Sequence, residues 1–153
     1  IAAAPLQYVG VFRNTPVETV VDTATQLGLV AVQLHGSEDQ DYINTLRGRL
    51  PDAVKIWKAL SVKDSLPARD LQHVDKYLFD NGQGGTGQRF DWSLLAGQTL
   101  DNVLLAGGLG ADNCVDAAKT GCSGLDFNSG VESEPGKKDA SKLASVFRTL
   151  RAY

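Results

Sequence analysis

The sequence predicts an α/β fold: a parallel (β/α)8 barrel in which six strand–helix units are present. Six short apolar runs alternate with helical patterns, and the centres of successive runs lie 23, 24, 22, 26 and 21 residues apart. Such spacing is typical of repeated βα units and a parallel sheet. The turn after the first run lacks the glycines that open a doubly wound sheet. Small-residue pairs instead follow the last two runs, where barrels commonly bind phosphate after strands seven and eight.

The first three units occupy residues 6–60, with strands expected at 6–12, 30–34 and 54–60. We expect the first helix to have Thr15 as N-cap, Pro16 at its first position and Glu18 completing a capping box, and to end at Gly28. Ser37 is the expected N-cap of the second helix. The apolar faces expected for the two helices are Val17, Val20, Val21, Ala24 and Leu27, and Tyr42, Ile43, Leu46 and Leu50.

The last three units have weaker helical patterns. Residues 61–74 contain Pro67 and predict a short or irregular helix, and Trp92 begins a helical or irregular return after the strand at 77–79. Further strands are expected at 102–106 and 123–127, and helices at 111–120 and 138–152. The inward positions expected on these helices are Cys114, Val115 and Ala118, and Leu143, Val146, Phe147 and Leu150.

The stretch from residue 76 to residue 92 is the first candidate site. The apolar run at 77–79 ends on Asp80, and four glycines follow within six residues: Gly82, Gly84, Gly85 and Gly87. An acid at the carboxyl end of a buried strand, followed by a glycine-rich loop, is where α/β enzymes place catalytic groups. An Asp that merely caps a turn is the alternative interpretation.

Two late turns form the second candidate site. Gly107–Gly108 and Ser129–Gly130 expose backbone N–H groups after the last two strands, and such groups bind anions. They predict a phosphate site, with ordinary turn glycines as the alternative.

Composition narrows the range of partners. A single domain spanning residues 1–153 is expected, and a net charge of −3 argues against nucleic-acid binding. No apolar run approaches the roughly 20 residues that a membrane helix needs. Cys114 and Cys122 lack zinc-type spacing, so we expect no metal, and their reading as buried free thiols fits the cytoplasm. The chain contains no Met, so we expect it to be the C-terminal part of a longer chain, lacking the first two βα units.

Five motifs together resemble phosphoribosylanthranilate isomerase of tryptophan biosynthesis. The resemblance covers essentially the whole chain and is greatest to the isomerase domain fused, in some bacteria, behind indole-glycerol-phosphate synthase. The motifs are Tyr8-Val9-Gly10-Val11-Phe12; Val32-Gln33-Leu34-His35-Gly36; Leu78-Phe79-Asp80-Asn81 with Gly84-Gly85-Thr86-Gly87 and Phe90-Asp91-Trp92; Leu105-Ala106-Gly107-Gly108-Leu109; and Leu125-Asp126-Phe127-Asn128-Ser129-Gly130-Val131-Glu132.

The resemblance implies an Amadori rearrangement of N-(5-phosphoribosyl)anthranilate, without metal or cofactor. It makes Asp80 the general acid, which requires a pKa raised by an enclosed site or by the substrate. It places His35 and Asp126 at strand ends that face the substrate, although local structural roles remain the alternatives. Arg13 lies in the wrong unit to be the family's substrate-binding Arg, and His73 is expected at the surface.

The family's general base is a Cys in a Cys-Gly-(Leu/Ile)-(Thr/Lys) motif, which this sequence does not contain. Cys114 and Cys122 are expected at the wrong places to replace it. We therefore expect the chain alone to be inactive and, because its first and last strands would be open edges, to associate through an edge or with a missing N-terminal segment. The alternatives are another phosphosugar enzyme, which usually carries Lys and Glu at strand ends (Lys58 lies short of its strand end), or a non-catalytic folding fragment that binds phosphate.

Overall fold

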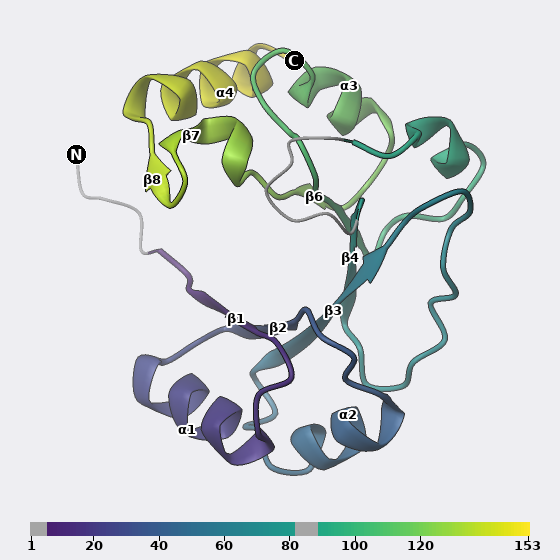
Figure 1. The fold of residues 1–153 in the computed structure, drawn as a ribbon, viewed down its shortest axis with the longest axis vertical. Coiled ribbons are helices and arrows are strands. Elements are labelled where there is room, and N and C mark those ends of the chain that lie inside the picture. Colours follow the sequence, from purple (N-terminus) through teal and green to yellow (C-terminus); the bar gives the residue numbers. More distant parts are fainter. Residues whose placement is uncertain (1–5, 82–88) are drawn as a thin grey trace. The chain divides into compact units, whose positions relative to one another are not determined.

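A computed structural model describes residues 6–81 and 89–153 of the 153-residue chain. Residues 1–5 and the predicted glycine loop with Gly82, Gly84, Gly85 and Gly87 lie outside the described residues. The fold is α/β, as predicted, with six parallel strands in the sheet order β1-β2-β3-β4-β5-β6 (Figure 1). Two compact units make up the chain, residues 1–59 with 69–77 and residues 60–68 with 78–153. The single-domain organisation stays a prediction.

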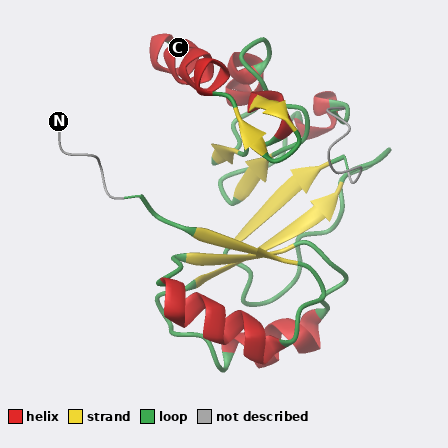
Figure 2. Ribbon diagram, turned by 60° about the vertical axis from the view of Figure 1, so that its left-hand side comes forward, coloured by secondary structure: helices red, strands yellow, loops and turns green. Residues whose placement is uncertain are grey.

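The first unit contains β1 (Val9–Phe12), α1 (Val17–Leu27), β2 (Ala31–Leu34), α2 (Gln40–Arg47) and most of β3 (Lys55–Ser61). The three strands are in parallel register, with Val32 opposite both Gly10 and Ile56. Both helices lie on the same face of these strands (Figure 2). Their apolar stripes form the core between the layers. Its fully buried residues include Val20, Val32, Leu34, Ile43, Leu46 and Ile56.

The helix starts differ from the predictions. Pro16 is the N-cap of α1, no side chain caps that helix, and Thr15 Oγ1 donates back to the carbonyl of Arg13 instead. The predicted capping box is therefore wrong, whereas the C-terminal Gly28 is left-handed as expected. The cap of α2 is Asp39, which accepts from Tyr42 N at 2.9 Å, and not Ser37. The helix starts later than expected because the preceding turn bonds instead to Asn14 and Glu38.

Two further expectations in this part of the chain are wrong. Leu27 is 65% exposed, because α1 ends there and its last turn extends past the core. Residues 62–75 form no helix, since Pro67 interrupts a largely polar stretch. Backbone groups there bond to side chains instead: Leu71 N donates to the hydroxyl of Tyr77 at 3.0 Å, and Gln72 N donates to Gln40 Oε1 at 2.8 Å.

The second unit contains the rest of β3, most of β4 (Lys76–Asp80) and the elements that follow them. These are the 3-10 turn η1 (Trp92–Leu95), β5 (Val103–Leu105), α3 (Cys114–Lys119), β6 (Gly124–Leu125), the 3-10 turn η2 (Ser129–Val131), the hairpin β7 (Glu132–Glu134) and β8 (Lys137–Lys138), and α4 (Ala140–Ala152). The sequence did not predict the hairpin. Helices α3 and α4 lie side by side (Figure 1).

The inward faces of α3 and α4 differ in part from the predictions. Ala117 rather than Ala118 is fully buried with Cys114, and Phe147 is 57% exposed while its neighbour Val146 is 2% exposed. Ala117 lies three residues after Cys114 and so shares its face of α3, whereas Phe147 follows Val146 directly and so points about 100° away from it on α4. No helix in the described ranges is long and apolar enough to cross a membrane.

Candidate functional site

Asp80 and Asp126 lie at the same end of β4 and β6, the two strands that flank β5 in the second unit. Ala106 N donates to the carbonyl of Phe79 at 2.8 Å, and Asp126 N donates to the carbonyl of Leu105 at 2.8 Å. These bonds place the carboxyl ends of β4, β5 and β6 side by side. Both carboxylates are half-buried there. The sequence predicted this arrangement, in which acids at strand ends share an edge with the phosphate turns.

The two predicted phosphate turns interlock. Gly107 and Gly108, after β5, have φ values of +88° and +65°, which side-chain-bearing residues rarely adopt. Gly130, at the start of η2, lies so close to the first turn that a Cβ there would stand 2.0 Å from the carbonyl oxygen of Leu109. Glycine is therefore required at Gly130 for space and at Gly107 and Gly108 for backbone conformation.

The turns leave backbone donors available. Within residues 6–81 and 89–153, the N–H groups of Gly107, Gly108, Ser129 and Gly130 make no hydrogen bond to another described residue. Ser129 and Gly130 form the first turn of η2, whose N–H groups have no partner inside the turn and which no side chain caps. Neighbouring free N–H groups on two adjoining turns are a suitable anion site.

Asn113 braces the first turn. Its Nδ2 donates to the carbonyl of Gly108 at 2.9 Å, and its Oδ1 accepts from Gly110 N at 2.9 Å. Sequence reasoning missed this residue because it placed position 113 inside a helix. An Asn three residues after a glycine turn, just before an apolar helix, was the available signal.

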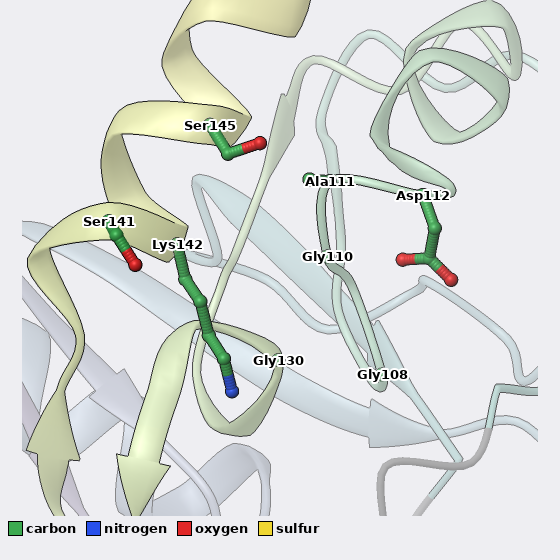
Figure 3. Close-up of a pocket in the computed structure, with 8 residues that line it drawn as sticks. All are labelled: Gly108, Gly110, Ala111, Asp112, Gly130, Ser141, Lys142 and Ser145. Atoms are coloured by element: carbon green, nitrogen blue, oxygen red, sulfur yellow. The ribbon is translucent and has the colours of Figure 1, made fainter.

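A cavity of about 370 Å³ lies beside both turns, lined by Gly108, Gly110, Gly130, Ser141, Lys142 and Ser145 among others (Figure 3). The ammonium of Lys142 extends from α4 toward the turn at Gly130 and donates to the carbonyl of Glu132 at 2.6 Å. Asp139 accepts from the hydroxyl of Ser141 and from the N–H groups of Lys142 and Ser141, and these hydrogen bonds lower its pKa. At the start of α4, the group available to an anion in the cavity is therefore the Lys142 ammonium and not the backbone N–H groups of Ser141 and Lys142. No local sequence pattern pointed to Lys142.

His35 is half-buried in the first unit, directly after β2. Its N–H donates to the carbonyl of Phe12 at 2.8 Å, and its Nε2 contacts the amide nitrogen of buried Gln33. The predicted strand-end position of His35 is confirmed.

Lys58, from β3, is buried, and its ammonium donates to Glu38 at 2.9 Å and to the carbonyl of Gly36 at 2.7 Å. It is thus committed to this turn.

The remaining candidates lie elsewhere. Cys114 is the buried first residue of α3, and Cys122 lies between α3 and β6, at the opposite end of that strand from Asp126; in the part of the chain that the structure describes, neither forms a disulfide. His73 is exposed, as predicted. Among the described residues no group of three His, Cys, Asp or Glu side chains is placed to hold a metal ion.

Comparison with known proteins identifies the family. Residues 1–149 match the family model for N-(5'phosphoribosyl)anthranilate (PRA) isomerase. The chain belongs to the PRA isomerase family. It is 72% identical over 153 residues to the tryptophan biosynthesis protein TrpCF of Salmonella typhi and 66% identical to that of Yersinia pestis. All of the chain aligns in both cases, but it covers only 34% and 32% of those proteins. The chain thus spans about a third of the length of the curated relatives that it matches.

Solved structures of the family share the fold. The isomerase of Thermus thermophilus superposes with a TM-score of 0.81 at 31% identity, covering 99% of this chain and 76% of that one. A PRA isomerase in complex with reduced 1-(o-carboxyphenylamino)-1-deoxyribulose 5-phosphate superposes with a TM-score of 0.73 at 29% identity, covering 95% and 71%.

Proposed function

We propose that this chain supplies the general acid and the phosphate-binding turns of a PRA isomerase, which rearranges N-(5-phosphoribosyl)anthranilate to its 1-deoxyribulose isomer in tryptophan biosynthesis. The observation that carries the proposal is the juxtaposition, on adjoining strands, of Asp80 and Asp126 with two turns that offer free N–H groups. Membership of the family supports the substrate, as does the ribulose phosphate compound bound by a solved relative.

The proposed chemistry consists of proton transfers alone. Asp80 donates a proton to the ribose ring oxygen, the C1′–O bond breaks, and an iminium forms. A base then removes the C2′ proton, and the resulting enol tautomerises to the ketone, so that no atoms are gained or lost. The phosphate would accept hydrogen bonds from the N–H groups of Gly107, Gly108, Ser129 and Gly130. His35 and Asp126 are proposed to contact the substrate.

The base step needs a group from outside this chain. The family's Cys motif does not occur in the sequence. Cys114 is buried at the start of a helix, and Cys122 lies at the amino end of β6. We therefore propose that the 153-residue chain alone binds phosphate but does not turn over substrate. Two cysteines that form no disulfide within the described residues fit a cytoplasmic location, which is part of the same proposal.

The open edge of β1 supports a second part of the proposal. This strand is the last in the sheet order, and apolar side chains on it and just before it face solvent: Val11 is 62% exposed, and Leu6 and Tyr8, which precede the strand, are 77% and 60% exposed. An unpaired apolar edge pairs readily with another chain. We expect self-association of the chain, measured as an increase of molar mass with concentration in light scattering.

The experiment is an assay of the longest native polypeptide that carries this sequence, and of the 153-residue chain, with N-(5-phosphoribosyl)anthranilate as substrate. Product formed by the long polypeptide and not by the short chain supports the proposal. Turnover by the purified short chain would contradict it, because another residue would then serve as base. No turnover by either would favour a non-catalytic, phosphate-binding role.

Another phosphosugar reaction is the alternative function. Such enzymes usually carry Lys and Glu at strand ends, whereas Lys58 lies short of its strand end and is bonded to Glu38 and to backbone carbonyls. This observation favours the isomerase, because a buried lysine bonded to Glu38 and to the carbonyl of Gly36 is not placed to donate to a substrate.

A further inference from the structure

Glu38 and Lys58 form a buried ion pair in the first unit, whereas the groups assigned to acid catalysis and phosphate binding belong to the second. Their Oε2 and Nζ atoms lie 2.9 Å apart, and their side chains are 1% and 5% exposed. Burying two charges costs nearly as much as their attraction returns, so stability alone is a weak reason for such a pair. The bonds that the pair makes indicate another role.

Both members of the pair hold the backbone on either side of His35. Glu38 Oε2 accepts from Gly36 N at 2.8 Å. Lys58 Nζ donates to the carbonyl of Gly36 at 2.7 Å and lies 3.5 Å from the carbonyl of Leu34. Since His35 N is itself bonded to β1, the peptide groups before and after His35 are both fixed.

Asn14 extends this network to the end of β1. Its N–H donates to Glu38 Oε1 at 2.7 Å, so both carboxylate oxygens of Glu38 are used. Its Oδ1 accepts from Ser37 N at 2.8 Å. It has a φ of +50°, a conformation that Asn tolerates better than most residues. A Cβ on Gly36 would stand 2.1 Å from Asn14 Oδ1, so the turn packs directly on this side chain.

We propose that Glu38 and Lys58 are positioning residues, which hold the turn at residues 35–37 so that the His35 imidazole keeps the orientation needed for the substrate. The inference rests on the proposed function, in which His35 contacts the substrate. Within the described residues, the Lys58 ammonium contacts Glu38, the carbonyl of Gly36 in this turn and the carbonyl of Leu34 just before His35. A change in the pair is therefore transmitted first to His35.

The test is the double variant Glu38→Gln/Lys58→Met, which leaves no unpaired charge. The glutamine carbonyl can still accept from Asn14 N, but its NH₂ group then faces Gly36 N and cannot accept a hydrogen bond from it. Methionine has no donor for the carbonyl of Gly36. The turn therefore loses the hydrogen bonds that the pair makes to Gly36. In the long native polypeptide we expect kcat/KM to fall roughly 10- to 100-fold, the size of a misplacement effect. The matched control is Glu134→Gln/Lys137→Met, which removes an exposed ion pair of the second unit and should leave kcat/KM unchanged.

A mutant cycle with His35 separates positioning from a general structural effect. If the pair acts through His35, then adding the double variant to His35→Ala produces little further loss of kcat/KM. If the double variant and His35→Ala instead lower kcat/KM by independent factors that multiply, the proposal is wrong.

NMR tests the positioning of His35 without measuring turnover. A failure of the positioning proposal can therefore be distinguished from a failure of the proposed function. The chain has two histidines, and His73→Gln assigns their imidazole signals. In the double variant we expect the His35 signals to shift and the Gly36 amide to exchange faster, with the His73 signals unchanged. Unchanged His35 and Gly36 signals would overturn the proposal, whatever the assay shows.

Asn14→Gly is the variant to use if the double variant does not fold. It keeps the backbone conformation and the bond to Glu38, but removes the acceptor for Ser37 N. The His35 signals should shift here too, and the Ser37 amide should exchange faster. His35 and Ser37 signals that match wild type in this variant would overturn the proposal.

Discussion

The carbonyl oxygen of Leu109 occupies the position where a Cβ of residue 130 would lie, 2.0 Å from an ideal Cβ. The turn after β6 can therefore approach the turn after β5 only with glycine at position 130. This contact places the free N–H groups of both turns in one region. Substitutions at Gly130 should separate the turns and weaken anion binding.

Gly130→Ala should cost roughly 1–3 kcal/mol of unfolding free energy, because backbone atoms must shift to admit a methyl group. It should also weaken phosphate binding. Urea unfolding and a phosphate titration followed by NMR measure the two effects. Gly48→Ala is the control, since Gly48 is right-handed at the end of α2 with its nearest atoms at 3.6 Å. Equal phosphate affinity in both variants would contradict the site.

Asp80→Asn in the long polypeptide should lower kcat by about 10² to 10⁴, because Asn keeps the shape but cannot donate the proton. Stability should stay near wild type, since the bond from Val62 N to the backbone carbonyl of Asp80 is kept. Asp101→Asn, at an exposed carboxylate of the same unit, serves as the control. Wild-type turnover would remove Asp80 from the mechanism.

Asn113→Ala should release Gly110 N and the carbonyl of Gly108, both within a packed turn. Leaving such groups unpaired costs about 1–3 kcal/mol, and the loosened turn should bind phosphate less tightly. Asn44→Ala removes only an exposed contact with Gln40 on α2 and is the matched comparison. We would abandon the bracing role of Asn113 if both variants had the same stability and phosphate affinity.

The stability of the fold should decrease in acid partly because of Glu38. Burial raises the pKa of this carboxyl, but hydrogen bonds from Lys58 and Asn14 N and the lysine charge outweigh it, so the pKa lies below its ordinary value of 4.5. A depressed pKa stabilises the folded state above the unfolded value, and that contribution is lost as pH falls through the folded one. Glu38→Gln/Lys58→Met should therefore flatten the stability profile below about pH 4.5. An unchanged acid slope in urea unfolding would contradict this.

The sequence predicted the strands better than the helix caps, for physical reasons. Buried parallel strands read as continuous apolar runs, so β2 and β4 were found within one residue at each end. The start of α2 was missed because the Glu38 carboxylate accepts from Gly36 N and Asn14 N, a contact across 24 residues that no local pattern records. Asp39 caps the helix in consequence.

The residues of the candidate site likewise fall into those that could be predicted from the sequence and those that could not. Gly107, Gly108 and Gly130 could be predicted because backbone conformation at the first two and lack of space at the third select glycine, which is visible in sequence. The strand-end acids could be predicted because the sheet is parallel. Lys142 could not, since only the packing of α4 against the two turns brings it to the cavity.

Lys142→Met should weaken phosphate binding by a few-fold while leaving stability nearly unchanged. The side chain is exposed and its ammonium lies at the cavity, so its attraction for an anion is real but screened by solvent. Added salt should therefore reduce the difference between wild type and variant. Lys119→Met, at an exposed lysine at the end of α3 paired with Asp116, changes net charge equally and controls for long-range effects. The measurement is an NMR titration with inorganic phosphate, in which the amides of Gly107, Gly108, Ser129 and Gly130 should shift most. Shifts centred on Lys137 and Lys138 instead, or equal effects of the two lysine variants, would show that the anion binds elsewhere.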